Sequence, residues 1–282
     1  MIDGRLLLGT SSWTGDGWVG SFYPPGCKPA DFLGHYSKQF DTVEIDATFY
    51  RIPSAKMVEQ WRERTPAGFT FAAKLPQSIT HERVLVDADG DLKAFLEVME
   101  LLGEKLGPLL LQFPYFNKKV FARPEDFIAR LAPFLAKLPK DFRYAVEIRN
   151  KAWIAEPFLD LLRKHRVALA LIDHPWMTPI QQLAERFDLA TTDFSYIRFL
   201  GDRKGIEQRT KVWDKIIVNR EREMETWTPE IQRLLQQRLM VYLYFNNHYA
   251  GNAPGSIRLF REVWERLAGK GTRESTRPAR AS

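Results

Sequence analysis

Charged and amide side chains stand at the ends of short apolar segments along most of the chain. Carboxylates such as Glu44 and Glu147 could exchange protons with a substrate, and Lys74, if shielded from water, could act as a base or form a Schiff base. Arg149 and Arg198 suit two-pronged binding of a phosphate or carboxylate. We therefore predict three reactive residues, Glu44, Lys74 and Glu147. The polar candidates at these segment ends are Glu44, Asp46, Lys74, Gln112, Glu147, Arg149, Asp173, Arg198 and Asn246.

The spacing of these residues predicts that they share one face of each strand. Side chains alternate along a strand, so Glu44 lies on the same face as Asp46, and Glu147 on the same face as Arg149. The residues between them are apolar and suit contact with helices. We expect the polar faces to point into a common interior, where these charges must be paired with one another or bound to a ligand.

An ion network that only fills the interior is the alternative to a binding site. Glu44 with Lys74, and Glu147 with Arg149 or Arg198, could form such pairs, and we favour a counter-ion role for Lys74 over a reactive one. Polar residues at the ends of nearly all the strands nevertheless favour a site. The predicted ligand-binding residues are Trp13, Asp46, Tyr50, Gln112, Arg149, Asp173, Arg198 and Asn246; the two aromatic ones could stack on a sugar or nucleobase, or only pack beneath loops.

The segments that must position these residues alternate between short apolar runs and longer runs of helical period. Eight strand–helix repeats predict a single (β/α)8 TIM barrel, a closed parallel sheet of the α/β class with its site at the C-terminal ends of the strands. An open doubly wound sheet is the alternative, but the segment after the first strand is not a dinucleotide fingerprint. The expected strands are Leu6–Ser11, Thr42–Asp46, Phe69–Lys74, Pro108–Phe113, Tyr144–Arg149, Val167–Asp173, Ser195–Leu200 and Met240–Asn246.

Local signals predict where several helices begin and end. Ser54 is expected to cap one helix and Pro124 to open another, and Thr228-Pro229-Glu230 is expected to start a third. Gly269 is expected to end the last helix. We also expect the long charged connection 201–228 to cover the mouth of the barrel.

Composition indicates a cytoplasmic protein with one barrel domain at residues 1–268 and a disordered basic tail at residues 269–282. Cys27 is the one cysteine, no apolar run is long enough for a membrane span, and the start does not resemble a signal peptide. The tail holds about half of the formal charge of +6, so the body is too weakly basic to argue for nucleic-acid binding on charge alone.

Histidines beyond three of the predicted strands raise the question of a metal site. His81, His174 and His248 follow the third, sixth and eighth strands, and Asp173 is adjacent to His174. No two of these histidines have the short spacing typical of a metal-binding pair. We therefore predict neither a metal nor another cofactor.

Eight segments of the chain form distinctive motifs: 9–13, 18–24, 42–53, 71–76, 79–81, 106–114, 147–153 and 244–248. Together they resemble the family called domain of unknown function 72, also known as YecE-like. The resemblance implies a barrel similar to those of xylose isomerase and endonuclease IV, but it implies no reaction. Asp46 stands where the family tends to have Asn, Ser12 where Gly is common, and Asn150 and Leu200 where His is frequent.

The sequence leaves three functional hypotheses open. The leading one is a protein that binds a small anionic or polyhydroxylated ligand, which could be phosphorylated, with Arg149, Arg198 and Asn246 as its main contacts. The second is a metal-dependent nucleic-acid phosphodiesterase similar to endonuclease IV, and the third is a binding module without catalysis. A small molecule is the favoured partner and nucleic acid the alternative. We predict no membrane partner, and the oligomeric state stays open.

Overall fold

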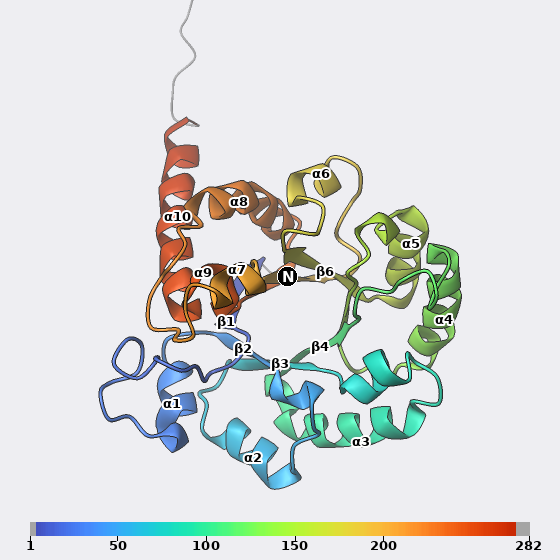
Figure 1. Ribbon diagram of the computed structural model, residues 1–282, viewed down its shortest axis with the longest axis horizontal. Helices are drawn as coiled ribbons and strands as arrows, with labels where there is room; N and C mark the ends of the chain where they lie inside the picture. Colours follow the sequence, from blue (N-terminus) through green and yellow to red (C-terminus); the bar gives the residue numbers. More distant parts are fainter. Residues whose placement is uncertain (1–3, 275–282) are drawn as a thin grey trace, which may run out of the picture.

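A closed ring of parallel strands forms the centre of the molecule (Figure 1). The computed structural model describes residues 4–274. Its eight-stranded sheet has the order β1-β8-β7-β6-β5-β4-β3-β2, and helices surround it, which confirms the predicted TIM barrel. The strands are β1 (Arg5–Thr10), β2 (Thr42–Ile45), β3 (Thr70–Lys74), β4 (Leu106–Gln112), β5 (Tyr144–Glu147), β6 (Ala168–Asp173), β7 (Phe194–Phe199) and β8 (Met240–Phe245).

Glycine allows the two ends of the sheet to meet. β1 pairs in parallel with β8, with Leu7 opposite Tyr242, while its other edge lies against β2. A Cβ atom at Gly9 would collide with the carbonyl oxygen of Thr42 on β2. The close approach of the two backbones therefore requires glycine at this position.

The helices cover the outside of the ring. Ser54 caps α2 as expected, since its Oγ accepts a hydrogen bond from the Met57 N–H at 3.3 Å, and Pro124 opens α4. The helices are α1 (Phe32–Tyr36), α2 (Ala55–Glu63), α3 (Asp89–Met99), α4 (Pro124–Lys137), α5 (Glu156–His165), α6 (Ile180–Ala184), α7 (Arg203–Glu207), α8 (Glu221–Gln236), α9 (Asn247–Ala250) and α10 (Ala253–Glu274). Short 3₁₀ turns occupy Pro29–Asp31, Ala47–Phe49, Glu100–Lys105 and Lys151–Trp153, and a π-helical turn occupies Ser78–Glu82.

Two predicted helix boundaries are wrong. α8 begins at Glu221 and carries Pro229 in its interior, because a buried stripe that includes Met224 and Ile231 extends on both sides of the proline. The Thr228 hydroxyl donates to the Met224 carbonyl at 2.8 Å within this turn. α10 continues through Gly269 to Glu274, since glycine lowers helix stability by only ~1 kcal/mol. Residues 275–282 of the predicted tail lie outside the described residues.

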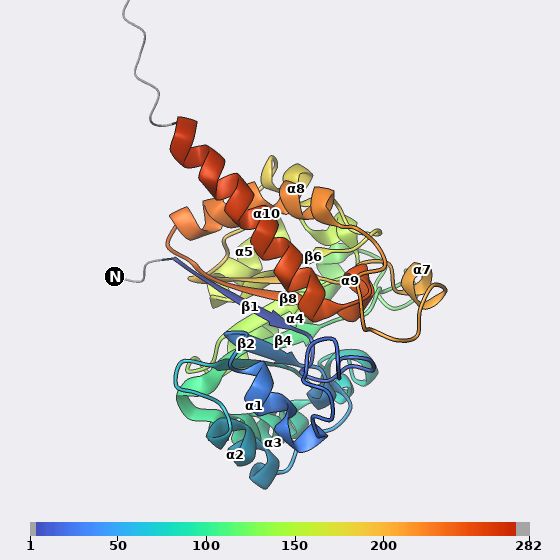
Figure 2. The same ribbon diagram turned by 90° about the vertical axis from the view of Figure 1, so that its left-hand side faces the viewer.

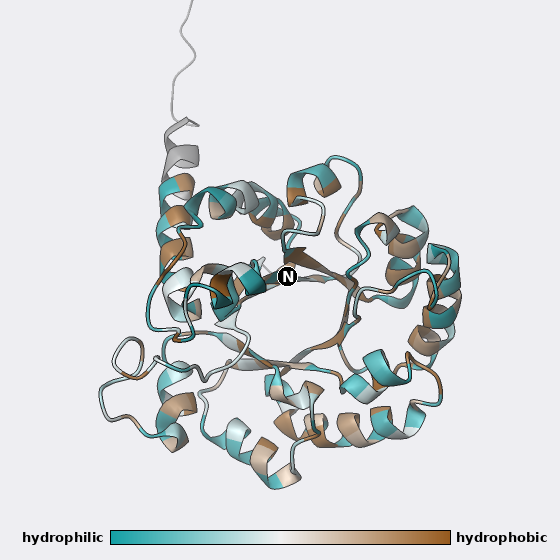
Figure 3. Cartoon of the chain, in the orientation of Figure 1, coloured by the Kyte–Doolittle hydropathy of each residue, from teal (hydrophilic) through white to brown (hydrophobic). Residues whose placement is uncertain are grey.

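Two groups of buried side chains confirm the predicted alternation. An outer group, which includes Val43, Ile45 and Val146, packs between the sheet and the helices. The strands are mostly brown in Figure 3, whereas the helices alternate between brown and teal. A separate inner group fills the barrel: Leu7, Ala72, Leu110, Ala145, Ala168, Ala170, Phe194, Tyr196, Tyr242 and Tyr244.

The two ends of the barrel carry different elements. In Figure 2 the strands run from the marked N-terminus on the left toward α7 and α9 on the right, so these two short helices lie at the C-terminal ends of the strands. Within residues 4–274, no helix combines the length and the apolar character that crossing a membrane would need.

Candidate functional site

A cavity of about 580 Å³, which we call the central cavity, opens at the C-terminal ends of the strands. TIM-barrel enzymes keep their active sites at this end of the fold. The cavity is lined by Asp46, Phe49, Tyr50, Lys74, Gln77, His81, Gln112, Arg149, His174, Arg198, Leu200, Gly201, Arg203, Asn246 and His248. The structure thus brings together side chains that follow or end seven of the eight strands.

The predicted site residues fall into three groups. Asp46, Tyr50, Lys74, Gln112, Arg149, Arg198 and Asn246 line the central cavity. Glu44 and Glu147 are fully buried and lie beneath it. Trp13 is half-buried, packs edge-on against Trp61 with ring centroids 5.3 Å apart, and does not line the cavity, and Asp173 lines a neighbouring one.

Arg198 on β7 is the centre of a buried ion network beneath the cavity. Its Nη1 lies 2.6 Å from Glu147 Oε2, and its Nη2 lies 2.7 Å from Glu44 Oε1. The Tyr196 hydroxyl donates to the other oxygen of Glu44 at 2.6 Å. Because Arg198 is only 1% exposed, its guanidinium joins two buried carboxylates and leaves little surface for a ligand.

The charges of the network keep both glutamates ionised. Burial on its own would raise the pKa of Glu147, but Arg149, Arg198 and Lys74 outweigh it and hold that pKa at about 2. Burial likewise opposes the ionisation of Glu44, whose pKa is lowered on balance by Arg198 and Lys74. A carboxylate with a depressed pKa and no exposed surface is poorly suited to proton exchange with a ligand.

Arg149 and Lys74 form the layer between the network and the cavity. Arg149 Nη2 lies 2.6 Å from Glu147 Oε1, while the Nε atom of Arg149 has no hydrogen-bond partner among the described residues. Lys74 Nζ lies 2.6 Å from Asp46 Oδ1, so it pairs with Asp46, whereas the ion network considered from the sequence had paired it with Glu44. Burial raises the pKa of Asp46 against the pull of Lys74. Both cations therefore contact an acid below or beside them and also line the cavity.

Three histidines line the wall of the central cavity. Burial lowers the pKa of His81, His174 and His248, and the charges of Lys74 and Arg149 add to this effect at His81. The imidazoles are therefore neutral near pH 7 and can donate or accept hydrogen bonds. Among the side chains that the structure describes, no three histidine, cysteine, aspartate or glutamate residues form a group that could hold a metal ion.

His248 connects the cavity wall to the connection that was expected to cover the mouth. Its Nε2 lies 3.0 Å from Glu207 Oε1 on α7, and its Nδ1 lies 2.6 Å from Asn246 Oδ1. The Trp213 ring packs against the imidazole at 4.9 Å between centroids. Residues Gly201 and Arg203 of the same connection line the cavity, so this segment forms one side of its mouth.

Sequence reasoning did not select several of the lining residues. Gln77 and Arg203 had no role in the prediction, and His81, His174 and His248 were considered only as metal ligands. Each of these residues follows a strand end within a few positions, as Gln77 follows Lys74. Extending the search for polar side chains from the strand ends into the loops after them would have found the whole group.

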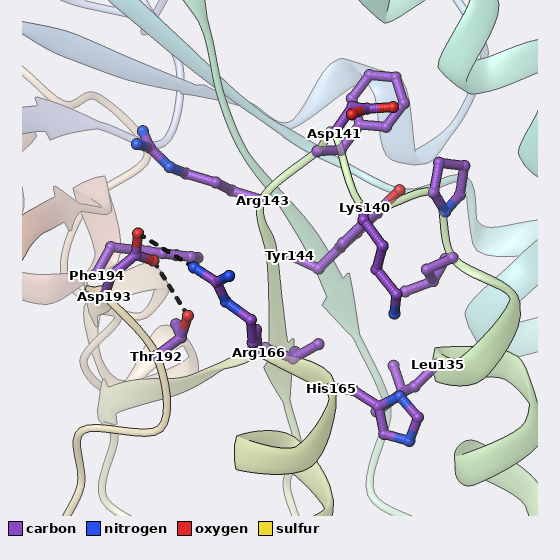
Figure 4. A pocket seen from close by; sticks show the side chains of 14 residues that line it. Leu135, Lys140, Asp141, Arg143, Tyr144, His165, Arg166, Thr192, Asp193 and Phe194 are labelled. Carbon is purple, nitrogen blue, oxygen red and sulfur yellow. Dashed lines mark hydrogen bonds and ion pairs between the residues drawn. The ribbon is translucent and has the colours of Figure 1, made fainter.

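A cavity at the opposite end of the barrel contains none of the predicted residues. It measures about 310 Å³ and is lined by the N-terminal end of β5 and by the segments before β6 and β7. Figure 4 shows Tyr144 at its centre, between Arg143 and Lys140, and Arg166 beside Asp193, whose carboxylate lies 4.0 Å from it. Because Arg143, Arg166 and Asp193 are exposed surface residues, we do not assign the site to this end.

Comparison with known proteins connects this chain to a family. The profile of the family described as "Protein of unknown function DUF72" matches residues 7–281. The UPF0759 protein YunF of Bacillus subtilis (strain 168) is 29% identical over 277 residues, which cover 92% of this chain and 94% of that protein. The UPF0759 protein YecE of Escherichia coli (strain K12) is 30% identical over 151 residues, 54% of this chain and 51% of that protein.

A solved structure agrees with these matches. The crystal structure of a DUF72 family protein from Thermotoga maritima MSB8 superposes with a TM-score of 0.71 at 27% identity. The match covers 94% of this chain and 99% of that one, so the barrel is shared over its full length. The resemblance that the sequence motifs indicated is confirmed.

Proposed function

The chain belongs to the DUF72 family, and from this premise we propose that its central cavity binds a small anionic, polyhydroxylated ligand. A phosphate is the anionic group that suits this cavity best. The observation that carries the proposal is the half-buried Arg149, which lines the cavity while its Nη2 is held by Glu147 at 2.6 Å. A guanidinium fixed on one side by a buried carboxylate is oriented to bind an anion with its remaining N–H groups.

The charge of the cavity supports an anionic ligand. Lys74 and Arg149 face it from below and Arg203 from its mouth, whereas Asp46 is its one acidic lining residue among those described. Glu44 and Glu147 neutralise Arg198 one layer deeper, so their negative charge is screened from the cavity by the cations above them. The lining side chains that a ligand can contact therefore include more cations than acids, although Arg203 is paired with Glu207.

Neutral polar groups support hydroxyls as the rest of the ligand. Gln77, Gln112 and Asn246 line the cavity with amide groups that can donate and accept, and neutral His81 and His174 add ring nitrogens of the same capacity. Such a set matches the mixed donors and acceptors of a polyhydroxylated molecule. A cytoplasmic location, which the single Cys27 favours, would expose the cavity to phosphorylated metabolites.

Lys74 is the predicted reactive residue that a ligand can reach. Glu44 and Glu147 have no exposed surface, so within this proposal they orient Arg198 and Arg149 and do not contact the ligand. Lys74 lines the cavity beside Asp46, where proton transfer between a ligand and this pair is geometrically open.

Calorimetric titration with inorganic phosphate and sulfate tests the proposal. We expect binding in the millimolar range or tighter and at least a tenfold loss of affinity in Arg149→Ala. Arg166→Ala is a matched control, because Arg166 lines the cavity at the opposite end of the barrel. Absence of binding to either anion, or equal losses in the two variants, would refute the proposed site.

A further inference from the structure

A second cavity, which we call the side cavity, adjoins the central one at the C-terminal end of the barrel. It measures about 510 Å³ and lies between the loop after β6 and the first turns of α8. His174 and Gly201 line both cavities, so one wall separates them. A ligand held in the central cavity can therefore extend past His174 without leaving the protein surface.

Asp173 at the end of β6 is the acidic group at the inner end of the side cavity. It is half-buried, and the Tyr249 hydroxyl is 3.5 Å from its Oδ2, a long distance for a hydrogen bond. Burial raises the pKa of Asp173 to about 6, against the opposing charge of Arg220 and contacts from Trp227 and Tyr249. Asp173 is therefore a carboxylate whose capacity to accept hydrogen bonds is largely unused.

Arg220, one of the two arginines that line the side cavity, is already occupied; the other is Arg222, an exposed residue on α8. Arg220 Nε donates to the Tyr249 carbonyl at 3.0 Å, and its Nη1 lies 2.7 Å from Glu223 Oε1. The positive charge of Arg220 disfavours a ligand ammonium in the same space. Neutral donors avoid this repulsion, so hydroxyl groups are the partners that suit Asp173 best.

Apolar and aromatic side chains form part of the wall of the side cavity. Met177, Ile180 and Trp227 line it; Trp176, which precedes Met177, is not a lining residue but has 69% of its surface exposed. The Trp176 ring lies edge-on to His174, the residue that both cavities share, at 5.2 Å between centroids. A carboxylate beside exposed aromatic surface suits a sugar ring, which offers hydroxyls at its edge and C–H groups on its faces.

We propose that the ligand spans both cavities, with its anionic group in the central cavity and a neutral, hydroxyl-bearing ring in the side cavity, bound by Asp173. The chemical class is a glycosyl phosphate or a similar anionic ester with a sugar-like substituent. This inference rests on the proposed function of the central cavity and assigns the side cavity the part of the ligand that determines specificity.

A series of probes of increasing length tests the inference. Affinities are measured by calorimetry for inorganic phosphate, for a set of hexose 1-phosphates, and for disaccharide 1-phosphates built on the same hexoses. We expect at least one sugar phosphate to bind ten times more tightly than inorganic phosphate. The neutral sugars alone should bind much more weakly than their phosphates.

Two variants locate the added affinity in the side cavity. Asp173→Asn removes the negative charge at nearly constant volume, and Thr226→Trp fills the side cavity from an exposed position on α8 while leaving Asp173 in place. In both variants the sugar phosphate should bind at most threefold more tightly than inorganic phosphate, and the affinity for inorganic phosphate itself should not change. Asp193→Asn, at the opposite end of the barrel, is the matched control.

The outcomes separate this inference from the proposed function. If inorganic phosphate binds in an Arg149-dependent way and no sugar phosphate gains affinity, the side cavity has no such role and the central site stands. If the sugar phosphate keeps its higher affinity in Thr226→Trp, the proposed role of the side cavity is also refuted. If neither phosphate nor any sugar phosphate binds, the central site fails and the inference fails with it.

Discussion

The ion network under the barrel mouth and the cavity surface above it use the same kinds of residue in different ways. In the network, Arg198 joins Glu44 and Glu147, and these three side chains have almost no exposed surface. One layer above, Lys74 and Arg149 each contact one carboxylate and reach the cavity. Burial depth, and not residue type, thus separates groups that hold the site together from groups that can meet a ligand.

Removing Arg198 should show the largest effect of this difference. Among the partners that the described residues provide, Arg198→Met leaves Glu44 with the Tyr196 hydroxyl and Glu147 with Arg149, and loss of one partner of a buried ion pair costs about 3–5 kcal/mol. We expect a loss of this size in the free energy of unfolding, measured by urea titration. Arg149→Met, one layer higher, should cost about 1 kcal/mol. Equal losses in the two variants would show that the two layers do not differ.

Acid should destabilise the buried ion network of Arg198, Glu44 and Glu147, whereas changes of pH near neutrality should not. The pKa of Glu147 is about 2 in the folded protein and near 4.5 when unfolded, so its ion pairs contribute stability above pH 4.5. This contribution, of about 3 kcal/mol, is lost as the pH falls toward 2. The free energy of unfolding of Glu147→Gln should be lower at pH 7 and vary less between pH 4.5 and 2. A parallel pH profile in the two proteins would contradict the assignment.

Anion binding in the central cavity should depend on pH because His81 and His174 line its wall. Burial lowers the pKa of His81 and His174 in the free protein, and a bound anion would raise it, so binding takes up protons as the pH falls below 6.5. Sulfate is the suitable probe because it does not titrate between pH 5 and 8. We expect its affinity to rise about threefold from pH 8 to pH 5, and His81→Asn to reduce that rise. An affinity that is independent of pH would exclude the histidines from the binding surface.

The sequence predicted the barrel and the buried ion network better than it predicted the surface of the central cavity. Alternation along β2 and β5 placed Glu44 and Glu147 in the interior correctly, because a strand fixes the direction of every side chain. Beyond the strand ends that rule no longer applies. Trp13 was expected in the central cavity, but it lies in the loop after β1 and packs against Trp61. Asp173 was also expected there, but as the last residue of β6 it shares the outer face of Leu169 and Leu171 and therefore lies in the side cavity.

Pairing inside the site was predicted less well for a similar reason. Glu44 with Lys74 was one of the pairs considered for an ion network, yet Lys74 contacts Asp46 at 2.6 Å, and Arg198 from β7 occupies Glu44. The choice depends on the distance across the barrel between strands that are far apart in the sequence, and residue spacing carries no information about it. The same limit applied to Pro229, where burial of the stripe on α8 outweighed a local helix-start signal.

Substitution of Asp173 should have the smallest effect on stability and should stabilise the protein, whereas the substitutions of Arg198 and Glu147 should destabilise it. Its pKa is raised to about 6, so the folded protein binds its proton more tightly than the unfolded chain, and this contribution to stability is lost as the pH rises from about 4 to 6. Asp173→Asn removes the cost of a half-buried charge and should raise the free energy of unfolding at pH 7 by about 1 kcal/mol, with little change at pH 4. Chemical denaturation at the two pH values measures this difference. A variant that is more stable at pH 7 yet binds sugar phosphates no better than phosphate would show that the protein retains a destabilising carboxylate for the ligand. A variant that is less stable at pH 7 would instead make Asp173 a structural partner of Tyr249.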